Sequence, residues 1–345
     1  RAIAIPAGDS LVMTGSLGYF QPIGATYHIK KSNMFSVEKQ ESHYFEELTG
    51  IQHGWEFNVS QLSDSRELSR VWLYQTPRIA YNRFRYGAAF DQRLYSREGV
   101  LSFGLFDTDC PATFSHGQLI PNNAVTVFPR QNAMTGSSQV GFCGSGIHFS
   151  ESYLTALVER VYRLPWQRVI PDPGVHLPDH ARLEALRVEL LKWQQMADAG
   201  STFSASIVSR REESLALSVL DALWRGEPLE REKETKASHA MSRALEMIHG
   251  NELETILASE LCVYAGCSQK TLEKIFVKQF GVTPKKYIKC LRLARVRQSL
   301  RNPESLAGAS IIELAGAHGF WHMGQFAADY RAIYGELPSA TLKLS

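Results

Sequence analysis

Between about residues 51 and 165, apolar and polar positions alternate in short runs. The stretch RIAYNRFRY, residues 78–86, alternates in this way, and VLSFGLF and AVTVFPR are further runs rich in aromatic and branched residues. Turn-forming sequences such as REGV and PNNA separate the runs. Alternation with a period of two is typical of half-buried strands. The region is therefore predicted to fold as a small β-sandwich or β-barrel.

The periodicity then becomes helical. Leucines recur at spacings of three and four in DHARLEALRVELLKWQQMA, residues 179–197, and in EESLALSVLDALW, residues 212–224. These segments are predicted to be amphipathic helices, whose apolar faces either pack on their own sheet or contact a second copy of the chain. PDPGVHLP, residues 171–178, is expected to be a hinge. Near the N-terminus we expect a loose arm with one helix near Glu38–Leu48.

From about residue 239 the chain is helical and repeats itself. LEKIFVKQFGVTP, residues 272–284, and FAADYRAIYGELP, residues 326–338, share aromatic, glycine and proline positions 54 residues apart. Two copies of one supersecondary unit therefore follow each other. The predicted organisation is an N-terminal arm (1–50), a β-rich domain (51–165), a helical dimerisation or linker region (166–238) and a C-terminal domain (239–345).

Each copy is predicted to be a helix, a short turn and a second helix. In the first copy Gly266 marks the turn, Ser268 is placed to cap the second helix, and Gly281 is placed to end it. In the second copy Ser310 and Glu313 have the spacing of a capping box. A helix–turn–helix unit whose second helix has a polar outer face is the device that places a helix in the DNA major groove.

The charge distribution supports a nucleic-acid partner. The net charge of the whole chain is only +2, but between Ser268 and Arg301 ten lysines and arginines stand against one acidic residue, Glu273. Such a density is typical of a surface that faces phosphate and predicts salt-dependent binding. The second copy carries few cations, so we expect it to rely on hydrogen bonds and apolar contacts.

These motifs resemble the DNA-binding domain of the AraC/XylS family of bacterial transcription regulators, over about residues 245–343. The resemblance is carried by S-x-x-T-L-x-x-x-F, F-G-V-T-P-x-x-Y, R-L-x-x-V-R and G-F-W-H-x-G-x-F, which occur in this order. The sequence GFWHMGQFAADY is most similar to the branch of the family that contains the ethanolamine-operon regulator. The resemblance implies two recognition helices, joined by a stiff helix at about residues 284–300, that enter successive major grooves on one face of DNA.

The fold class expected from these observations is α+β. It consists of a cupin-like β-barrel or sandwich that binds an effector, a helical linker, and an all-α domain of two helix–turn–helix units. The resemblance implies a sequence-specific transcription regulator, expected to be an effector-responsive activator. Its expected partners are double-stranded promoter DNA, RNA polymerase, a small-molecule effector and a second copy in a homodimer.

The resemblance also places the DNA-binding residues. They are Ser268, Gln269, Lys270, Thr271, Glu273, Lys274 and Lys278 in the first unit, and Trp321, His322, Met323 and Gln325 in the second. Lysine can donate to guanine, glutamine to the adenine edge, glutamate can accept from cytosine, and an apolar atom can meet a thymine methyl group. Two alternatives stay open: Lys274 or Lys278 contacts only phosphate, and Trp321 or Met323 belongs partly to the core.

The effector pocket is less defined by the sequence. Aromatic residues of the strands are its candidates, and simple core packing is the alternative for them. The weak candidates are Trp72, Tyr81, Phe84 and Phe103. No apolar run reaches the length of a membrane helix, the first residues lack the order of a signal peptide, and the five cysteines form no Cys-x-x-Cys. We therefore expect a cytoplasmic protein with reduced thiols and no membrane partner.

The alternative function is a cupin-like catalytic or carrier domain fused to a basic tail that binds nucleic acid nonspecifically. A metal cupin needs a His-x-His pair, whereas His116 and His148 are isolated in the sequence. GFCGSG matches neither a phosphate-binding loop nor a nucleophile elbow and is expected to be a hairpin turn. We therefore expect no metal site, no cofactor, no catalytic residue and no enzymatic activity.

Overall fold

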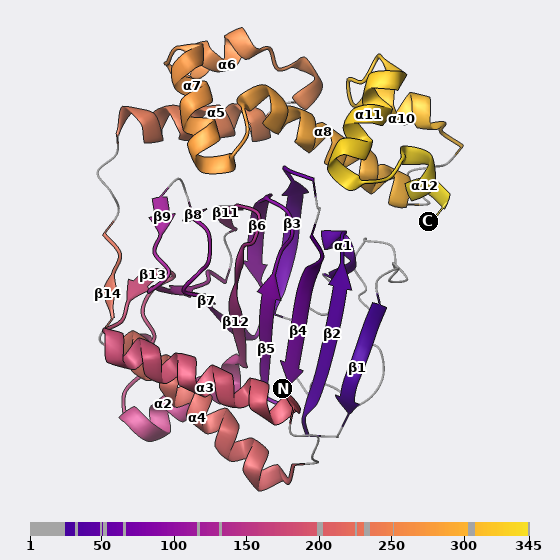
Figure 1. The fold of residues 1–345 in the computed structure, drawn as a ribbon. Coiled ribbons are helices and arrows are strands. Elements are labelled where there is room, and N and C mark those ends of the chain that lie inside the picture. The colour runs from indigo at the N-terminus through magenta and orange to yellow at the C-terminus, as the bar shows by residue number, and fades with distance from the viewer. Residues whose placement is uncertain are drawn as a thin grey trace.

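The computed structural model describes residues 25–31, 34–48, 50, 54–64, 67–115, 118–130, 133–198, 203–224, 226–230, 235–250, 252–302 and 308–343. In these residues a β-rich domain carries long helices on one side, and a separate helical domain lies over one end of its sheets (Figure 1). The arrangement is the mixed α+β fold that the sequence predicts.

The described strands form a large and a small antiparallel sheet. The large sheet has the order β1-β2-β4-β5-β12-β7-β10-β13-β14, and the small sheet has the order β3-β6-β11-β8-β9. The strands of the large sheet are β1 (Ala25–Lys31), β2 (Ser36–Ser42), β4 (Ser69–Gln75), β5 (Ile79–Arg85), β12 (Cys143–Ser150), β7 (Val100–Phe106), β10 (Val125–Val127), β13 (Gly174–Leu177) and β14 (Glu227–Pro228). Those of the small sheet are β3 (Trp55–Gln61), β6 (Phe90–Ser96), β11 (Met134–Ser138), β8 (Thr113–Ser115) and β9 (Gln118–Ile120).

Both faces of the large sheet are covered. On one face Tyr81 and Phe103 belong to a core that also contains Trp193 of the long helices. On the other face Phe84 and Trp55 belong to a second core, between the two sheets. Successive side chains of a strand point to opposite faces, so Tyr81 and Phe84 of β5 enter different cores.

Several helices pack against the large sheet. They are α2 (Glu151–Tyr162), the 3-10 helix η2 (Trp166–Arg168), α3 (His180–Asp198) and α4 (Ala205–Trp224). The leucines that predicted α3 and α4 are buried in the core beneath them, which confirms that these helices pack on their own sheet. On their outer faces Val188 and Leu191 remain exposed, so a contact with a second copy also stays open.

Two local predictions are wrong. The helix expected near Glu38–Leu48 is limited to α1 (Phe45–Leu48), because residues 36–42 form β2, which pairs along its whole length with β4. The hinge expected at residues 171–178 contains β13, which pairs with β10 and β14. Pairing with strands that are distant in the sequence determines the secondary structure of both segments. The local sequence pattern contains no information about that pairing. The expected arm falls partly outside the described residues, and from Ala25 the described part belongs to the large sheet.

The C-terminal domain contains the predicted repeat. Its elements are α5 (Lys236–Gly250), the 3-10 helix η3 (Leu253–Thr255), α6 (Ala258–Ala265), α7 (Gln269–Phe280), α8 (Pro284–Arg301), α10 (Ile311–Ala317), α11 (Met323–Tyr334) and α12 (Pro338–Lys343). The pairs α6–α7 and α10–α11 are the two helix–turn–helix units, and α8 joins them (Figure 1). Gly266 and Gly319 have φ of 68° and 77°, which explains glycine at the two turns.

Candidate nucleic-acid interface

Capping and burial fix the position of α7. The Ser268 hydroxyl accepts a hydrogen bond from the Thr271 backbone N–H at 3.3 Å, and Gly281 ends the helix with φ of 71°. Leu272, Phe276 and Phe280 are buried on the inner face. The caps predicted from the sequence are therefore confirmed, and together with the buried face they fix which side of α7 faces outward.

The outer side of α7 carries the predicted contact residues. Gln269, Lys270, Thr271, Lys274 and Lys278 are exposed, and Ser268 is exposed at the start of the helix. Glu273 is half-buried and accepts a hydrogen bond from Gln269 Nε2 at 2.9 Å. One turn of α7 therefore presents a linked amide and carboxylate between lysines, which is a mixed set of donors and acceptors suited to base edges.

The start of α11 differs in chemistry. Trp321 is 79% exposed, so it is not a core residue, and His322 and Gln325 are exposed beside it. Met323 is half-buried and packs against the core of the domain. His322, at the N-cap, makes no side-chain capping bond, so the first backbone N–H groups of α11 remain free to donate to an acceptor such as phosphate.

The predicted basic surface is smaller in the structure than in the sequence. Arg297 and Arg301 are buried, with 1% and 8% of their surface exposed. Arg292 donates to the Leu253 carbonyl oxygen, and Lys289 pairs with Asp329 at 2.8 Å. The phosphate-facing surface is therefore smaller than the ten cations of the sequence indicate, because two of them are buried and two others bind groups within the protein.

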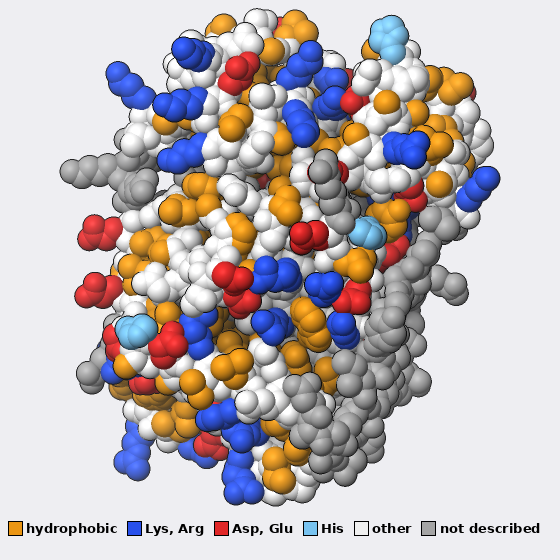
Figure 2. Space-filling view, in the orientation of Figure 1, with side chains coloured by type: hydrophobic (Ala, Val, Ile, Leu, Met, Phe, Trp, Pro, Cys, Tyr) orange, Lys and Arg blue, Asp and Glu red, His pale blue; other side chains and the backbone are white. Residues whose placement is uncertain are grey.

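The cations that remain exposed gather near α7 and the start of α8. They are Lys270, Lys274, Lys278, Lys285, Lys286 and Arg295. Figure 2 shows Lys and Arg side chains over the upper part of the molecule, where α6, α7 and α8 lie in Figure 1. Arg295 lies 3.9 Å from Glu254, so the five lysines are the more open part of this surface.

A cavity of about 50 Å³ lies between the two sheets of the β domain. Its aromatic lining comes from Trp55, Phe84, Tyr86, Phe106, Phe114, Phe128 and Phe142. Its polar lining comes from Gln92, Thr113, Ser115, Thr126, Thr135 and Ser145. Among the described residues the lining contains hydroxyl and amide groups but no charged side chain, which favours an uncharged and largely apolar occupant.

Of the four aromatic candidates for an effector site, Phe84 lines this cavity. Tyr81 and Phe103 are buried on the opposite face of the large sheet, and Trp72 packs against that same core. Phe114, Phe128 and Phe142 were not predicted from the sequence. Phe114 lies in the three-residue strand β8, Phe128 follows β10 and Phe142 precedes β12, so alternation within a strand gives little information about where these side chains point.

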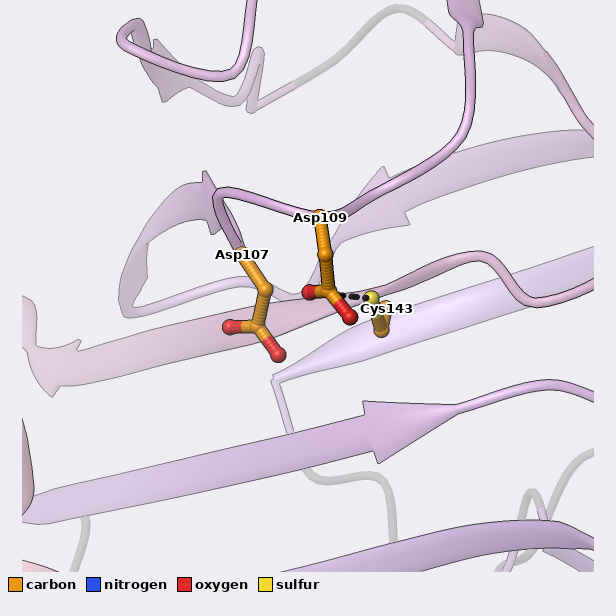
Figure 3. A group of neighbouring side chains, drawn as sticks. All are labelled: Asp107, Asp109 and Cys143. Carbon is orange, nitrogen blue, oxygen red and sulfur yellow. Dashed lines mark hydrogen bonds between the residues drawn. The ribbon is translucent and has the colours of Figure 1, made fainter.

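No metal site follows from the isolated histidines. His148 is buried, its Nδ1 lies 2.9 Å from the Ser102 hydroxyl, and its ring packs edge-on against Trp55. His116 lies outside the described residues. Among the described residues, Asp107, Asp109 and Cys143 offer ligand atoms within 4.8 Å of one another (Figure 3).

Arginines already neutralise the two carboxylates of this group. Arg85 pairs with Asp109 at 2.9 Å and Arg83 lies 3.8 Å from Asp107. The Cys143 thiol donates a hydrogen bond to Asp109, so it is protonated, whereas a metal ligand must be a thiolate. The group is therefore a cluster of Arg–Asp ion pairs beside a protonated thiol, and its ligand atoms are already engaged.

The C-terminal domain contacts one end of the small sheet. Tyr287 of α8 donates to Asp91 Oδ2 at 2.8 Å, Gln61 Nε2 donates to the Ile333 carbonyl oxygen at 2.9 Å, and the Ser137 hydroxyl donates to the Gln279 carbonyl oxygen at 3.1 Å. Gln92, the neighbour of Asp91 in β6, lines the cavity. The small sheet is thus a wall shared by the cavity and the helical domain.

The comparison with known protein families agrees with this geometry. Residues 261–344 match a family model described as a helix-turn-helix domain. The xylDLEGF operon transcriptional activator of Pseudomonas putida is 36% identical over 118 residues, which cover 34% of this chain and 36% of that protein. The regulator GbdR of Pseudomonas aeruginosa is 36% identical over 92 residues, covering 27% of this chain and 24% of that protein. Residues 261–344 therefore form a helix-turn-helix domain.

The match spans about a third of the length of these relatives. Among solved structures, the AraC-like transcriptional activator CuxR is 16% identical, covers 76% of this chain and 91% of its own, and has a TM-score of 0.35. ToxT of Vibrio cholerae is 11% identical, covers 85% of this chain and 99% of its own, and has a TM-score of 0.27. The similarity to the ethanolamine-operon branch stays a prediction. Within the described residues, no helix is both long and apolar enough to cross a membrane.

Proposed function

We propose that this protein is a sequence-specific DNA-binding transcription regulator. The observation that carries the proposal is the pair of helix–turn–helix units whose second helices, α7 and α11, expose polar starts while their apolar faces are buried. In this function the two helices enter successive major grooves, and α8 sets their separation.

The two units divide the work of binding. The exposed lysines around α7 supply the salt-dependent attraction to phosphate, and Gln269, Glu273 and Lys274 read base edges. The second unit has few cations, so Trp321 and Gln325 supply apolar and hydrogen-bonding contacts there. The free N–H groups at the start of α11 then hold a phosphate in place of a basic side chain.

The β domain is proposed to bind the effector in the cavity between its sheets. Because the described lining carries no charge, the effector is an uncharged molecule with a large apolar surface. Gln92 and Leu94 of β6 line the cavity, while Asp91 of the same strand contacts α8. An effector that binds one arrangement of β6 better than another therefore shifts the helical domain between arrangements.

The remaining proposed partners are a second copy of the chain and RNA polymerase. The exposed apolar residues Val188 and Leu191 of α3 and Ile207 of α4 give a surface for a homodimer. Contact with RNA polymerase and a cytoplasmic location follow from activation of transcription, which the name of the Pseudomonas putida relative describes for that protein.

DNA binding is tested by selecting target sites from a random duplex pool with the full-length protein. Gel shifts of the selected site and of a shuffled duplex are then compared at rising salt. We expect the selected site to retain its advantage at every salt concentration, and both affinities to fall with salt. Equal binding to both duplexes at every salt concentration would support a nonspecific basic tail and exclude the proposal.

The effector site is tested with two molecules of similar shape but different charge. Toluene is expected to raise the melting temperature of the full-length protein, whereas benzoate at the same concentration is expected to leave it unchanged. A rise with benzoate alone would contradict an uncharged effector and leave the DNA-binding proposal intact.

A further inference from the structure

Two buried thiols that are distant in the sequence meet at the rim of the β domain. Cys110 is 7% exposed and Cys143 is fully buried, and both are free thiols. The turn that ends at Cys110 is closed by a hydrogen bond from the Cys110 N–H to the Asp107 carbonyl oxygen at 3.0 Å. The Asp107 N–H donates to the Cys143 carbonyl oxygen at 3.2 Å, so this turn is fixed directly over the start of β12.

The contacts bring the two sulfur atoms together. The Cys143 backbone N–H donates to Cys110 Sγ at 3.4 Å, so the start of β12 lies directly against the Cys110 sulfur. The Cys143 thiol also donates to Asp109 Oδ1 at 3.7 Å, as Figure 3 shows. A bond between these two sulfur atoms therefore needs no large movement of the backbone.

The surroundings give the two thiols different chemistry. The Cys143 thiol and N–H and the Thr113 hydroxyl all lie around Cys110 Sγ, and the donors that Cys143 can offer to a thiolate lower the pKa of the Cys110 thiol. The neighbouring Cys110 thiol, together with burial, raises the pKa of the Cys143 thiol. Cys110 is therefore the thiol that ionises first, and Cys143 is the one that remains protonated beside it.

The pair is close to solvent although both sulfurs are buried. Asp109, whose carboxylate contacts Cys143 Sγ, has a side chain that is 66% exposed. The sulfurs thus lie about one side chain below the surface, within reach of a molecule as small as a hydroperoxide. Arg85 holds Asp109 in place over Cys143 and keeps the local charge balanced.

We propose that Cys110 and Cys143 form an oxidation site for small hydroperoxides, which converts them reversibly into an intramolecular disulfide. The Cys110 thiolate attacks the terminal peroxide oxygen, the O–O bond breaks, and the leaving oxygen takes a proton to give water or an alcohol. Cys110 then carries a sulfenic acid. The Cys143 sulfur attacks the Cys110 sulfur, the S–O bond breaks, and hydroxide leaves with the Cys143 proton as water. Both sulfurs are oxidised by one electron each, and the peroxide is reduced.

The location gives the disulfide a structural consequence. Phe106, just before the turn, and Thr113, just after it, line the cavity, as do Phe142 and Ser145 on either side of Cys143. A bond between Cys110 and Cys143 therefore joins two segments of the cavity wall that hydrogen bonds alone join in the reduced protein.

The experiment uses the reduced full-length protein, treated with a small molar excess of hydrogen peroxide and digested without reductant. Mass spectrometry is expected to find the peptides that contain Cys110 and Cys143 joined, and treatment with a dithiol reductant is expected to separate them. The Cys143→Ser variant is expected to stop at a sulfenic acid on Cys110, trapped by dimedone. The Cys110→Ser variant is expected to leave Cys143 unoxidised.

The matched control is the double variant Cys262→Ser with Cys267→Ser, which removes the two partly exposed thiols of the helical domain. It is expected to form the same bond as the unchanged protein. Free Cys110 and Cys143 thiols in the treated, folded control would overturn the proposal. A sulfenic acid on Cys143 in the Cys110→Ser variant would overturn the assignment of Cys110 as the attacking thiol.

Discussion

Arg297 shows how one cation of a basic segment can serve the fold instead of DNA. Its guanidinium is buried, pairs with Glu336 at 2.7 Å and donates to the Tyr330 hydroxyl at 3.2 Å. It also lies 4.6 Å from the ring centroid of Tyr44 and 4.5 Å from that of Tyr334. Because Tyr44 precedes α1 of the N-terminal domain, this one side chain connects the two halves of the molecule.

Replacing Arg297 by alanine is expected to cost about 3–5 kcal/mol of stability, because Glu336 would keep its charge in a mostly buried position without its partner. Denaturant unfolding followed by tryptophan fluorescence measures the loss. The control is Arg331→Ala, an exposed arginine at the end of α11, which is expected to change stability by about 0.5 kcal/mol or less. Similar losses for the two variants would contradict the role given to Arg297.

Lys274 is the residue that tests base reading in the first unit. Its side chain is exposed on the outer face of α7, and it directly follows Glu273 of the Gln269–Glu273 pair in the sequence. If it donates to a base, Lys274→Ala is expected to cost about 1–3 kcal/mol on the selected site and to relax the preference at one base pair. Quantitative gel shifts on single-base variants of the site measure this.

The control for this experiment is Lys236→Ala, at the exposed start of α5 and outside both helix–turn–helix units. It is expected to leave the preference unchanged. An equal loss of affinity for every duplex with Lys274→Ala would show that Lys274 contacts only phosphate.

At the scale of elements, the start of α10 depends on a capping box. Glu313 N–H donates to the Ser310 hydroxyl at 3.2 Å, and the Glu313 carboxylate accepts from the Ser310 N–H at 2.7 Å. Ser310→Ala is expected to lower the free energy of unfolding by about 1 kcal/mol, since the Glu313 N–H loses its acceptor and the Glu313 carboxylate loses the Ser310 hydroxyl. Thermal unfolding measures the change.

The matched control is Ser259→Ala in the first turn of α6, where the serine is exposed and alanine favours the helix. It is expected to be neutral or slightly stabilising. A loss as large as that of Ser310→Ala would mean that the capping box contributes nothing specific.

The elements also show where the sequence pattern predicts the secondary structure and where it does not. α3 and α7 follow their leucine and phenylalanine spacing because each packs one apolar face on a core. In contrast, SVEKQES reads as polar and helical, yet it forms β2 because β4 lies beside it and satisfies its backbone groups. The pairing energy comes from a strand about thirty residues away, so the local sequence does not contain it.

At the scale of the whole molecule, the contact between the two domains contains a titratable group. The Tyr287 hydroxyl donates to Asp91 Oδ2 at 2.8 Å and lies 3.3 Å from His249 Nε2. Burial raises the pKa of the Asp91 carboxyl to about 6, against an opposing effect of the Tyr287 hydrogen bond. Burial and the charges of Arg93 and Arg295 lower the pKa of His249.

These shifts predict opposite pH dependences. Between pH 4 and pH 6 the folded protein holds the Asp91 proton while the unfolded chain loses it, so the contribution of Asp91 to stability falls as pH rises. This loss of unfolding free energy is limited to about 2 kcal/mol, because the carboxyl keeps part of its contact with water. His249 opposes this fall over the same range, because stability is lost as pH falls through the ordinary pKa of histidine.

The variant Asp91→Asn isolates this contribution. The difference in unfolding free energy between the unchanged protein and Asp91→Asn is expected to shrink by about 2 kcal/mol from pH 4 to pH 6 and to be constant above pH 7. The control Asp221→Asn, an exposed residue of α4, is expected to give no such trend in this direction. A constant difference for Asp91→Asn would show that the carboxyl is not desolvated in the interface.

The sequence by itself determined the helical domain. Caps such as Ser268, Ser310 and Gly281, the aromatic stripes, and the repeat of 54 residues are local features, and each helix needs only its neighbours in the chain to form. It also determined that the middle of the chain is built from strands. These predictions succeeded because the interactions that stabilise the elements lie within one or two turns or within one alternating run.

Only the tertiary structure decided which residues face what. It turned Arg297 and Arg301 inward, left Trp321 exposed, separated Tyr81 from Phe84, and brought Cys110 to Cys143 and Asp91 to Tyr287. Each of these depends on chain segments that are distant in sequence, and the choice between solvent and core is made when whole sheets and helices pack. A charge count or a list of aromatics gives the composition of a surface or cavity, whereas the packing decides its members.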